Sequence, residues 1–211
     1  MKWESVPLGP LQTNCYVLYN DQGEAIIFDP GGDAEVLQEK IDNLGLRPAA
    51  ILLTHAHFDH IGAVETVRRS YDIDVYLHEN ERDWLTDPEK NGASLFLGDH
   101  RISAGEADHH IRQEGSLTIG SFAFYILETP GHSPGSVSFY HEESRTVFSG
   151  DVLFSGGIGR TDLPGGSQEQ LIKVIHDKIL ELPEDTYVAC GHGPFTVIQR
   201  EMDSNPFLNG F

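Results

Sequence analysis

The stretch Thr54-His55-Ala56-His57-Phe58-Asp59-His60 follows directly on the apolar run Ala49–Leu53, which has the composition of a buried β-strand. It brings four potential metal ligands into six residues: His55, His57, Asp59 and His60. Imidazole and carboxylate groups suit zinc, iron and manganese. The stretch therefore predicts a metal site at the end of a strand. The alternative is a polar turn whose histidines serve only as caps and hydrogen-bonding groups.

Three more candidate ligands stand at the ends of predicted strands, each directly after a glycine. They are His132 in Thr-Pro-Gly-His-Ser-Pro-Gly, Asp151 in Phe-Ser-Gly-Asp, and His192 in Cys-Gly-His-Gly. Glycine permits the close or left-handed backbone that a convergent site requires. With the first four they make seven nitrogen and oxygen ligands and no cysteine. That set is too large for one tetrahedral ion and suits two metals that share a bridging ligand, which argues against a closed structural zinc site.

The first third of the chain alternates predicted strands and helices, as α/β proteins do. Short runs rich in β-branched and aromatic residues predict strands at Asn14–Tyr19, Ala25–Phe28, Ala49–Leu53 and Val75–Leu77. The segment Asp33–Leu44 predicts an amphipathic helix, capped by Asp33, with Val36, Leu37, Ile41 and Leu44 on its apolar face. A second helix is predicted from about Ile61 to Arg69.

The later part of the chain predicts an antiparallel arrangement, because Phe122–Thr129, Ser136–Tyr140 and Thr146–Ser149 are joined by turns too short for helices. A capping-box pattern at Ser167 begins a helix whose buried stripe is Leu171, Val174, Ile175 and Ile179, and Tyr187–Cys190 is the final predicted strand. The polar stretch 86–114 predicts a long loop or irregular lid. The histidines outside the site motifs are expected on the surface or in loops: His78, His100, His109, His110, His141 and His176. Without a recognisable linker, residues 1–211 are expected to form a single domain of the α/β class, α+β in detail.

The charge balance limits the partners. Lys and Arg number 14 and Asp and Glu number 33, for a formal net charge of −19 in 211 residues. Such a field repels nucleic acid and anionic membranes. The sequence has no apolar stretch near membrane-spanning length, its opening residues lack the apolar core typical of a signal peptide, and it has only two cysteines, Cys15 and Cys190. We expect a cytoplasmic protein with a small-molecule partner and reduced thiols; the oligomeric state stays open.

The order of these motifs resembles the metallo-β-lactamase superfamily, and within it the hydroxyacylglutathione hydrolase (glyoxalase II) group, especially its short single-domain bacterial relatives. The resemblance covers nearly the whole chain. It rests on Asp29-Pro30-Gly31-Gly32, the His55–His60 cluster, Pro130-Gly131-His132-Ser133-Pro134-Gly135, Ser149-Gly150-Asp151-Val152-Leu153-Phe154, Gly157-Ile158-Gly159-Arg160-Thr161-Asp162 and Gly191-His192-Gly193. It implies an αββα sandwich of two mixed sheets flanked by helices, with ligands on loops along one edge.

The resemblance also implies roles for single residues. It assigns His55, His57 and His132 to one metal, Asp59, His60 and His192 to the other, and Asp151 to both as a bridge. Asp59 could also steer the attacking water, so Asp59 and Asp151 are the candidate catalytic residues. Asp29 is either the partner that orients a ligand imidazole or a turn residue before Pro30. Arg160 either meets the anionic thiol portion of a substrate or pairs on the surface with Asp162.

These assignments imply a dinuclear metal-dependent hydrolase of small thioesters, chiefly S-2-hydroxyacyl (lactoyl) conjugates of glutathione or another low-molecular-weight thiol. Two divalent ions, zinc as the first choice with iron or manganese as alternatives, would supply hydroxide and polarise the carbonyl. Glutathione specificity stays open, because we expect no C-terminal helical domain and the family's substrate-binding tyrosines are here Asp162 and Pro194. The enzymatic alternative is a mononuclear iron persulfide (sulfur) dioxygenase. The non-enzyme alternative is a metal-binding regulatory module. The charge disfavours a ribonuclease, and no sequence feature supports a β-lactam substrate.

Overall fold

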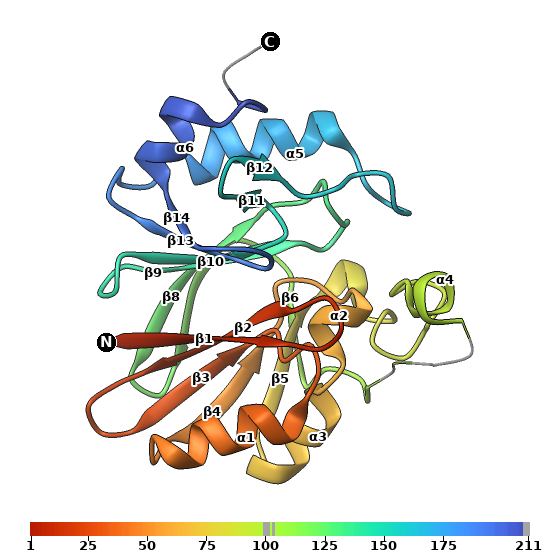
Figure 1. Ribbon diagram of the computed structural model, residues 1–211, viewed down its shortest axis with the longest axis vertical. Coiled ribbons are helices and arrows are strands. Elements are labelled where there is room, and N and C mark those ends of the chain that lie inside the picture. The colour runs from red at the N-terminus through yellow and green to blue at the C-terminus, as the bar shows by residue number, and fades with distance from the viewer. Residues whose placement is uncertain (99–101, 103, 209–211) are drawn as a thin grey trace. The chain divides into compact units, whose positions relative to one another are not determined.

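The computed structural model describes residues 1–98, 102 and 104–208, which form two compact units (Figure 1). Unit 1 consists of Met1–Arg112 and Ile119–Ser121, and unit 2 consists of Gln113–Thr118 and Phe122–Phe211. Each unit is built on a six-stranded mixed sheet with helices against it. Two mixed sheets flanked by helices confirm the predicted α/β class.

The sheet of unit 1 has its strands in sequence order: β1 (Lys2–Leu8), β2 (Thr13–Tyr19), β3 (Glu24–Phe28), β4 (Arg47–Leu52), β5 (Asp74–His78) and β6 (His109–Ile111). The pairs β1·β2 and β2·β3 are antiparallel, and β3 to β6 are parallel. The crossover helices α1 (Ala34–Asn43) and α3 (Val64–Tyr71) cover one face of this sheet (Figure 1). Parallel neighbours bring the ends of β3 and β4 to the same edge, where Asp29 and the histidine cluster follow.

Helix α1 confirms the helix predicted over Asp33–Leu44 to within one residue at each end, but only half of its predicted apolar stripe is buried. Leu37 and Ile41 are fully buried, whereas Val36 is 51% exposed and Leu44 is 39% exposed. The predicted cap is also wrong. Asp33 has a left-handed backbone and makes no side-chain cap; its Oδ2 accepts a hydrogen bond from the Gly9 N–H at 2.7 Å instead.

The helix predicted from Ile61 is divided into two parts, α2 (Phe58–Ile61) and α3. The division occurs where the chain passes close to the Pro30–Gly32 turn. A Cβ on Gly62 would lie 2.3 Å from the Gly31 carbonyl oxygen, and the Ala63 N–H donates to the Pro30 carbonyl at 2.9 Å. The Asp-Pro-Gly-Gly motif is therefore the surface on which the ligand-bearing α2 rests.

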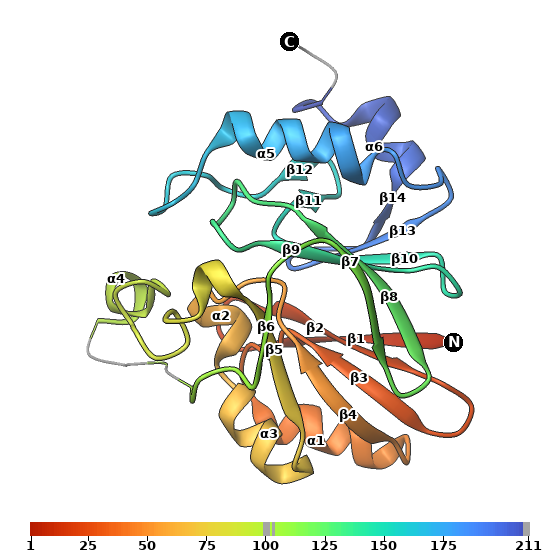
Figure 2. The ribbon, with the colours of Figure 1, turned by 180° about the vertical axis from the view of Figure 1, so that it is seen from behind.

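The sheet of unit 2 has the order β14 (Thr196–Val197), β13 (Tyr187–Cys190), β10 (Thr146–Gly150), β9 (Val137–His141), β8 (Phe122–Glu128) and β7 (Gly115–Ile119). As predicted, β8, β9 and β10 are antiparallel; β13 is parallel to β10. Helix α5 (Gln168–Val174) continues into a π-helical turn, Ile175–Ile179, and with α6 (Ile198–Ser204) it covers one face of this sheet (Figure 2). Ser167 caps α5 by accepting from the Gln170 N–H, and the predicted stripe is buried.

Two other predictions need correction. The stretch 86–114 is not simply a loop, since it contains α4 (Ala93–Leu97) and β6, which pairs with β5. The fully buried Asn91 organises the middle of this stretch, with Nδ2 donating to the carbonyls of Trp84 and Ile102.

His78 and His141 are buried rather than on the surface, and His100 lies outside the described residues. Among the described helices, none has both the length and the apolar character to cross a membrane.

Candidate metal centre

Unit 1 brings its four predicted ligands together at the end of β4. His55 and His57 lie in the loop after the strand, and Asp59 and His60 lie in α2. The His55 ring centroid is 4.8 Å from that of His57 and 4.1 Å from that of His60. The His60 Nε2 is 3.6 Å from the Asp59 Oδ2. All four side chains are buried, so any ion that they bind would lie among preorganised, poorly solvated donors.

Asp29 holds the back of this cluster. Its Oδ1 accepts from the Thr54 N–H at 2.8 Å, and its Oδ2 accepts from the Thr54 hydroxyl at 2.6 Å and lies 3.0 Å from the His60 Nδ1. The Thr54 Oγ1 is in turn 3.1 Å from the His55 Nδ1. With Nδ1 engaged in this way, each imidazole presents Nε2 to a metal. Asp29 therefore makes the contact that its orienting role requires, and its backbone is left-handed (φ 49°) just before Pro30.

Two residues of unit 1 contact the ligand loop without having been predicted. The Thr13 hydroxyl donates to the Asp59 Oδ2 at 2.7 Å, and the fully buried Glu81 accepts from the Ala56 N–H at 2.7 Å. Thr13 precedes Asp59 by 46 positions and Glu81 follows Ala56 by 25, so no local pattern links them. Gly31 is needed for a different reason, because a Cβ there would be 1.8 Å from the Asp59 carbonyl oxygen.

Unit 2 brings its three predicted ligands together around Asp151. His132 follows β8, Asp151 follows β10, and His192 follows β13. The Asp151 Oδ2 lies 3.6 Å from the His132 Nε2 and 3.5 Å from the His192 Nε2. One carboxylate oxygen thus lies near two imidazole nitrogens that the resemblance assigns to different metals. This is the placement that a bridging ligand requires.

The segment after Asp151 returns to orient His132. The His132 Nδ1 is 2.8 Å from the backbone carbonyl oxygen of Arg160, which it can reach as a donor while Nε2 faces Asp151. A Cβ on Gly159 would lie 1.8 Å from the Asp151 carbonyl oxygen. The Gly-Arg pair therefore has a structural reason: glycine allows the close approach, and the next carbonyl accepts from the imidazole.

The Arg160 side chain points to a different partner. Its Nε and Nη2 donate to the two carboxylate oxygens of Asp162 at 2.7 and 2.8 Å, and both side chains are largely exposed. This hydrogen bonding lowers the pKa of Asp162 to about 2 and raises the pKa of Arg160. The pairing with Asp162, one of the two interpretations of Arg160, is thus present. The substrate contact stays a prediction.

The donor set fits divalent ions of borderline softness. It consists of imidazole nitrogens and carboxylate oxygens, five of them histidine and two aspartate, which suits zinc, iron or manganese. Cys190 is near in sequence, but its buried thiol donates to the carbonyls of His192 and Pro194 at 3.2 and 3.3 Å. Burial is the main cause that raises the pKa of the Cys190 thiol to about 12, and the negative charge of Asp151 adds to it. Cysteine is therefore not part of the donor set.

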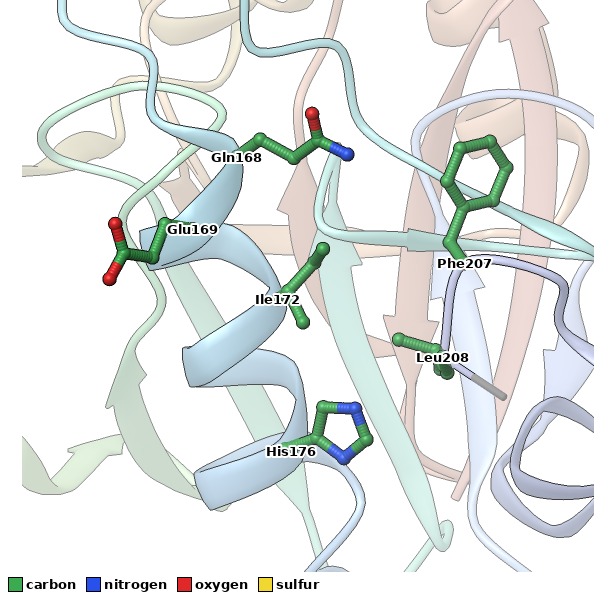
Figure 3. A pocket seen from close by; sticks show the side chains of 6 residues that line it. All are labelled: Gln168, Glu169, Ile172, His176, Phe207 and Leu208. Carbon is green, nitrogen blue, oxygen red and sulfur yellow. The ribbon is translucent and has the colours of Figure 1, made fainter. Parts of the chain in front are cut away.

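A hollow on unit 2 contains none of these donors (Figure 3). It has a volume of about 360 Å³, and it is lined by Gln168, Glu169, Ile172, His176, Phe207 and Leu208. In Figure 3, Ile172 and His176 extend from the helix toward Phe207 and Leu208. His176 therefore belongs to a mostly apolar surface depression and has no role in the ligand set.

Comparison with curated proteins gives relatives that match over the full length. The chain is 55% identical over 211 residues to "Probable metallo-hydrolase YqgX" of Bacillus subtilis, covering 100% of the chain and 99% of the relative. It is 42% identical over 210 residues to "Hydroxyacylglutathione hydrolase GloC" of Haemophilus influenzae, covering 99% of each. Both proteins are named as hydrolases, the first as a metal-dependent one.

Solved structures agree on the fold. The "BLEG-1 B3 metallo-beta-lactamase" has 59% sequence identity and a TM-score of 0.97, with 99% of this chain and 100% of that chain covered. "TTHA1623 in a di-iron-bound form" has 42% identity and a TM-score of 0.81, with 97% and 100% covered. These values show that the fold is that of the metallo-β-lactamases, as the motifs implied. Residues 8–192 match the family described as the metallo-beta-lactamase superfamily. The chain therefore belongs to the metallo-β-lactamase superfamily.

Proposed function

We propose that this chain is a dinuclear metal-dependent hydrolase of small thioesters, with S-2-hydroxyacyl conjugates such as S-lactoyl thioesters as the preferred substrates. The observation that carries the proposal is that the Asp151 Oδ2 lies 3.6 Å from the His132 Nε2 and 3.5 Å from the His192 Nε2. A relative named as a hydroxyacylglutathione hydrolase, 42% identical over 99% of both chains, supports the substrate class. The net charge of −19 supports a small molecule over nucleic acid as the substrate.

In this proposal, residues 1–211 act as a single functional domain. His55, His57 and His132 would hold one ion, Asp59, His60 and His192 the other, and Asp151 both. Zinc is the first choice for this donor set, and the di-iron form of a 42% identical protein makes iron the main alternative. When bound, such a pair of ions supplies hydroxide at neutral pH and polarises the carbonyl that hydroxide attacks.

The chain's own residues would hold and orient this chemistry. The Thr13 hydroxyl fixes the Asp59 carboxylate by donating to Oδ2, which would hold this carboxylate in place to orient a water. Asp29 and the Arg160 carbonyl hold the imidazoles of His60 and His132 by their Nδ1 atoms. A thiolate leaves readily, because the pKa of its conjugate thiol is only about 8.5, so no protein acid is required to protonate it.

Arg160 would bind the anionic portion of the thiol carrier. To do so, its guanidinium must exchange at least part of its paired contact with Asp162 for a substrate carboxylate. Both side chains are exposed to water, which weakens an ion pair, so the guanidinium can exchange this partner for a substrate carboxylate.

A second candidate function is β-lactam hydrolysis. The observation that favours it is the 59% identity to a protein named as a B3 metallo-beta-lactamase. The same hydroxide would attack the strained amide carbonyl of the lactam ring, and no additional protein nucleophile would be needed.

One experiment distinguishes these functions from the persulfide dioxygenase. Purified protein of known metal content is offered an S-lactoyl thioester, a chromogenic cephalosporin and glutathione persulfide separately, and thiol release, ring opening and oxygen uptake are followed. We expect thiol release that is not accompanied by oxygen uptake, and faster turnover of the thioester than of the cephalosporin. Faster ring opening would select the β-lactamase. Oxygen uptake with persulfide and no thioester cleavage would overturn the hydrolase proposal.

A further inference from the structure

The segment Asp151–Arg160, here called the ligand hairpin, connects two residues of the candidate site. It contains the short antiparallel strands β11 (Leu153–Phe154) and β12 (Gly157–Ile158). One end supplies the Asp151 carboxylate, and the other end supplies the carbonyl that accepts from the His132 Nδ1. Two-residue strands pair too weakly to be stable alone, so other contacts must fix the hairpin.

Helix α6 provides those contacts through a buried carboxyl group. Glu201 is only 1% exposed, although it lies in a C-terminal helix after the last predicted ligand. Its Oε2 accepts from the Gly156 N–H, at the tip of the ligand hairpin, at 2.9 Å. Its Oε1 accepts from the Thr196 hydroxyl at 2.5 Å. A buried acidic side chain is rare unless it is fully partnered, so this position is specified by the contacts that it makes.

Asn205 adds a second contact to the same turn. It is fully buried, and its Nδ2 donates both to the Gly157 carbonyl at 3.0 Å and to the Glu201 Oε2 at 2.8 Å. Glu201 and Asn205 thus hold consecutive residues of the hairpin tip, one by its N–H and the other by its carbonyl. The Gly159–Arg160 pair directly follows β12, which begins at Gly157, so we expect a shift of the tip to move the carbonyl that orients His132.

We propose that Glu201, supported by Asn205, is a positioning residue for the metal centre, which rests on the proposed function. It acts through the ligand hairpin on Asp151 and His132 and touches neither substrate nor metal. Loss of its carboxyl group removes the acceptor of the Gly156 N–H and one of the two acceptors of the buried Asn205 amide, and the tip must move to replace them. Groups that orient metal ligands typically contribute 10–100-fold to metal affinity.

The test compares Glu201→Ala, Glu201→Gln and Asn205→Ala with the parent and with Gln199→Ala, a control on the exposed side of the same helix. Glutamine can keep the geometry, since its oxygen can accept from Gly156 and Asn205 while its amide donates to the Thr196 hydroxyl. Metal affinity is measured by competition with a chelator, at a temperature where circular dichroism shows each metal-free variant to be folded. The melting temperature of each metal-free variant is recorded beside it.

We expect Glu201→Ala to bind metal about tenfold more weakly, the lower end of the range for orienting groups. Asn205→Ala should lose affinity in the same direction and to a smaller extent, while Glu201→Gln and Gln199→Ala should stay near the parent. Folded Glu201→Ala and Asn205→Ala proteins with parental affinity would overturn the inference and leave α6 a purely structural role. If Glu201→Ala does not fold without metal, Asn205→Ala decides. A parent that binds no metal would instead overturn the proposed function.

Discussion

At the scale of single residues, the strongest effect on activity is expected from a change at Asp151. Its Oδ2 lies within 3.6 Å of two imidazole nitrogens, so its removal takes a ligand and a negative charge from both proposed ions. We predict that Asp151→Ala lowers thioesterase activity by orders of magnitude and reduces the metal content below two ions per chain. Elemental analysis beside kcat/KM checks this. Asp162→Asn removes the same charge outside the donor set and should keep both ions. Two ions and parental turnover in Asp151→Ala would exclude the bridging role.

Arg160 gives a prediction about substrate charge. We expect Arg160→Ala to raise KM for anionic thioesters and leave neutral thioesters nearly unchanged, because a remote charge binds ground and transition states alike. Asp162→Asn should lower KM for the same anionic substrates, since it releases the guanidinium from its competing carboxylate. Steady-state kinetics with a matched pair of substrates measures both. Equal changes for neutral and anionic thioesters would contradict the assignment.

The pH dependence of this pair follows from the lowered pKa of Asp162. A depressed carboxyl pKa means that the pair is intact above the usual value near 3.8 and is lost only as the pH falls through about 2. The Asp162→Asn effect on KM should therefore be constant from pH 5 to pH 8.

At the scale of elements, the ligand hairpin should be sensitive to the addition of a single methyl group. A Cβ on Gly159 would lie 1.8 Å from the Asp151 carbonyl oxygen and 3.3 Å from the His132 Cβ. We predict that Gly159→Ala destabilises the fold by about 1–3 kcal/mol or more, as overpacking does, and displaces both ligands. Gly157→Ala is the matched control, because its nearest neighbour would be the Phe154 Cβ at 3.8 Å. Chemical denaturation and metal content are the measurements. Parental values for both in Gly159→Ala would contradict this packing.

Sequence reasoning succeeded for elements in which the local pattern and the tertiary environment agree. The predicted stripe of Leu171, Ile175 and Ile179, which runs from α5 into the π-helical turn after it, is buried as its period predicts. It failed where a residue far away in the sequence determines which contact a side chain makes. Asp33 gives its carboxylate to Gly9 rather than to its own helix, and the exposed Val36 shows that an apolar residue on a helix need not face the core.

The same limit applies to the candidate site. All seven predicted ligands stand in short motifs, so their identity is visible in the sequence, and each unit brings its own members together. Thr13 and Glu201 could not be found in this way. They act from other elements through hydrogen bonds to Asp59 and to Gly156, and their sequence neighbours contain no sign of that role.

At the scale of the whole molecule, metal binding should be linked to folding. An ion that binds only the folded chain stabilises it by about 2.7 kcal/mol when its free concentration is 100 times Kd. For a chain of about 200 residues we predict a rise in Tm of roughly 5–11 °C from that amount. Calorimetry of metal-free and metal-loaded protein tests it, with Asp151→Ala as the variant that should respond less. An unchanged Tm in the parent would contradict linkage to the folded state.

The net charge of −19 leads to the last prediction, which concerns salt. An anionic thioester approaching the protein is repelled by the overall field and attracted only near Arg160 and the proposed ions. Salt screens charges separated by more than about 10 Å at 0.1 M, and it screens close contacts much less. Added salt should therefore weaken the long-range repulsion first.

We predict that kcat/KM for anionic thioesters rises between 10 and 150 mM of an inert salt, while kcat/KM for a neutral thioester stays level. In Arg160→Ala the rise should be steeper, because the local attraction that partly offsets the field is gone. A fall in kcat/KM for the anionic substrate in the parent would show that local attraction governs its encounter and that the overall charge does not.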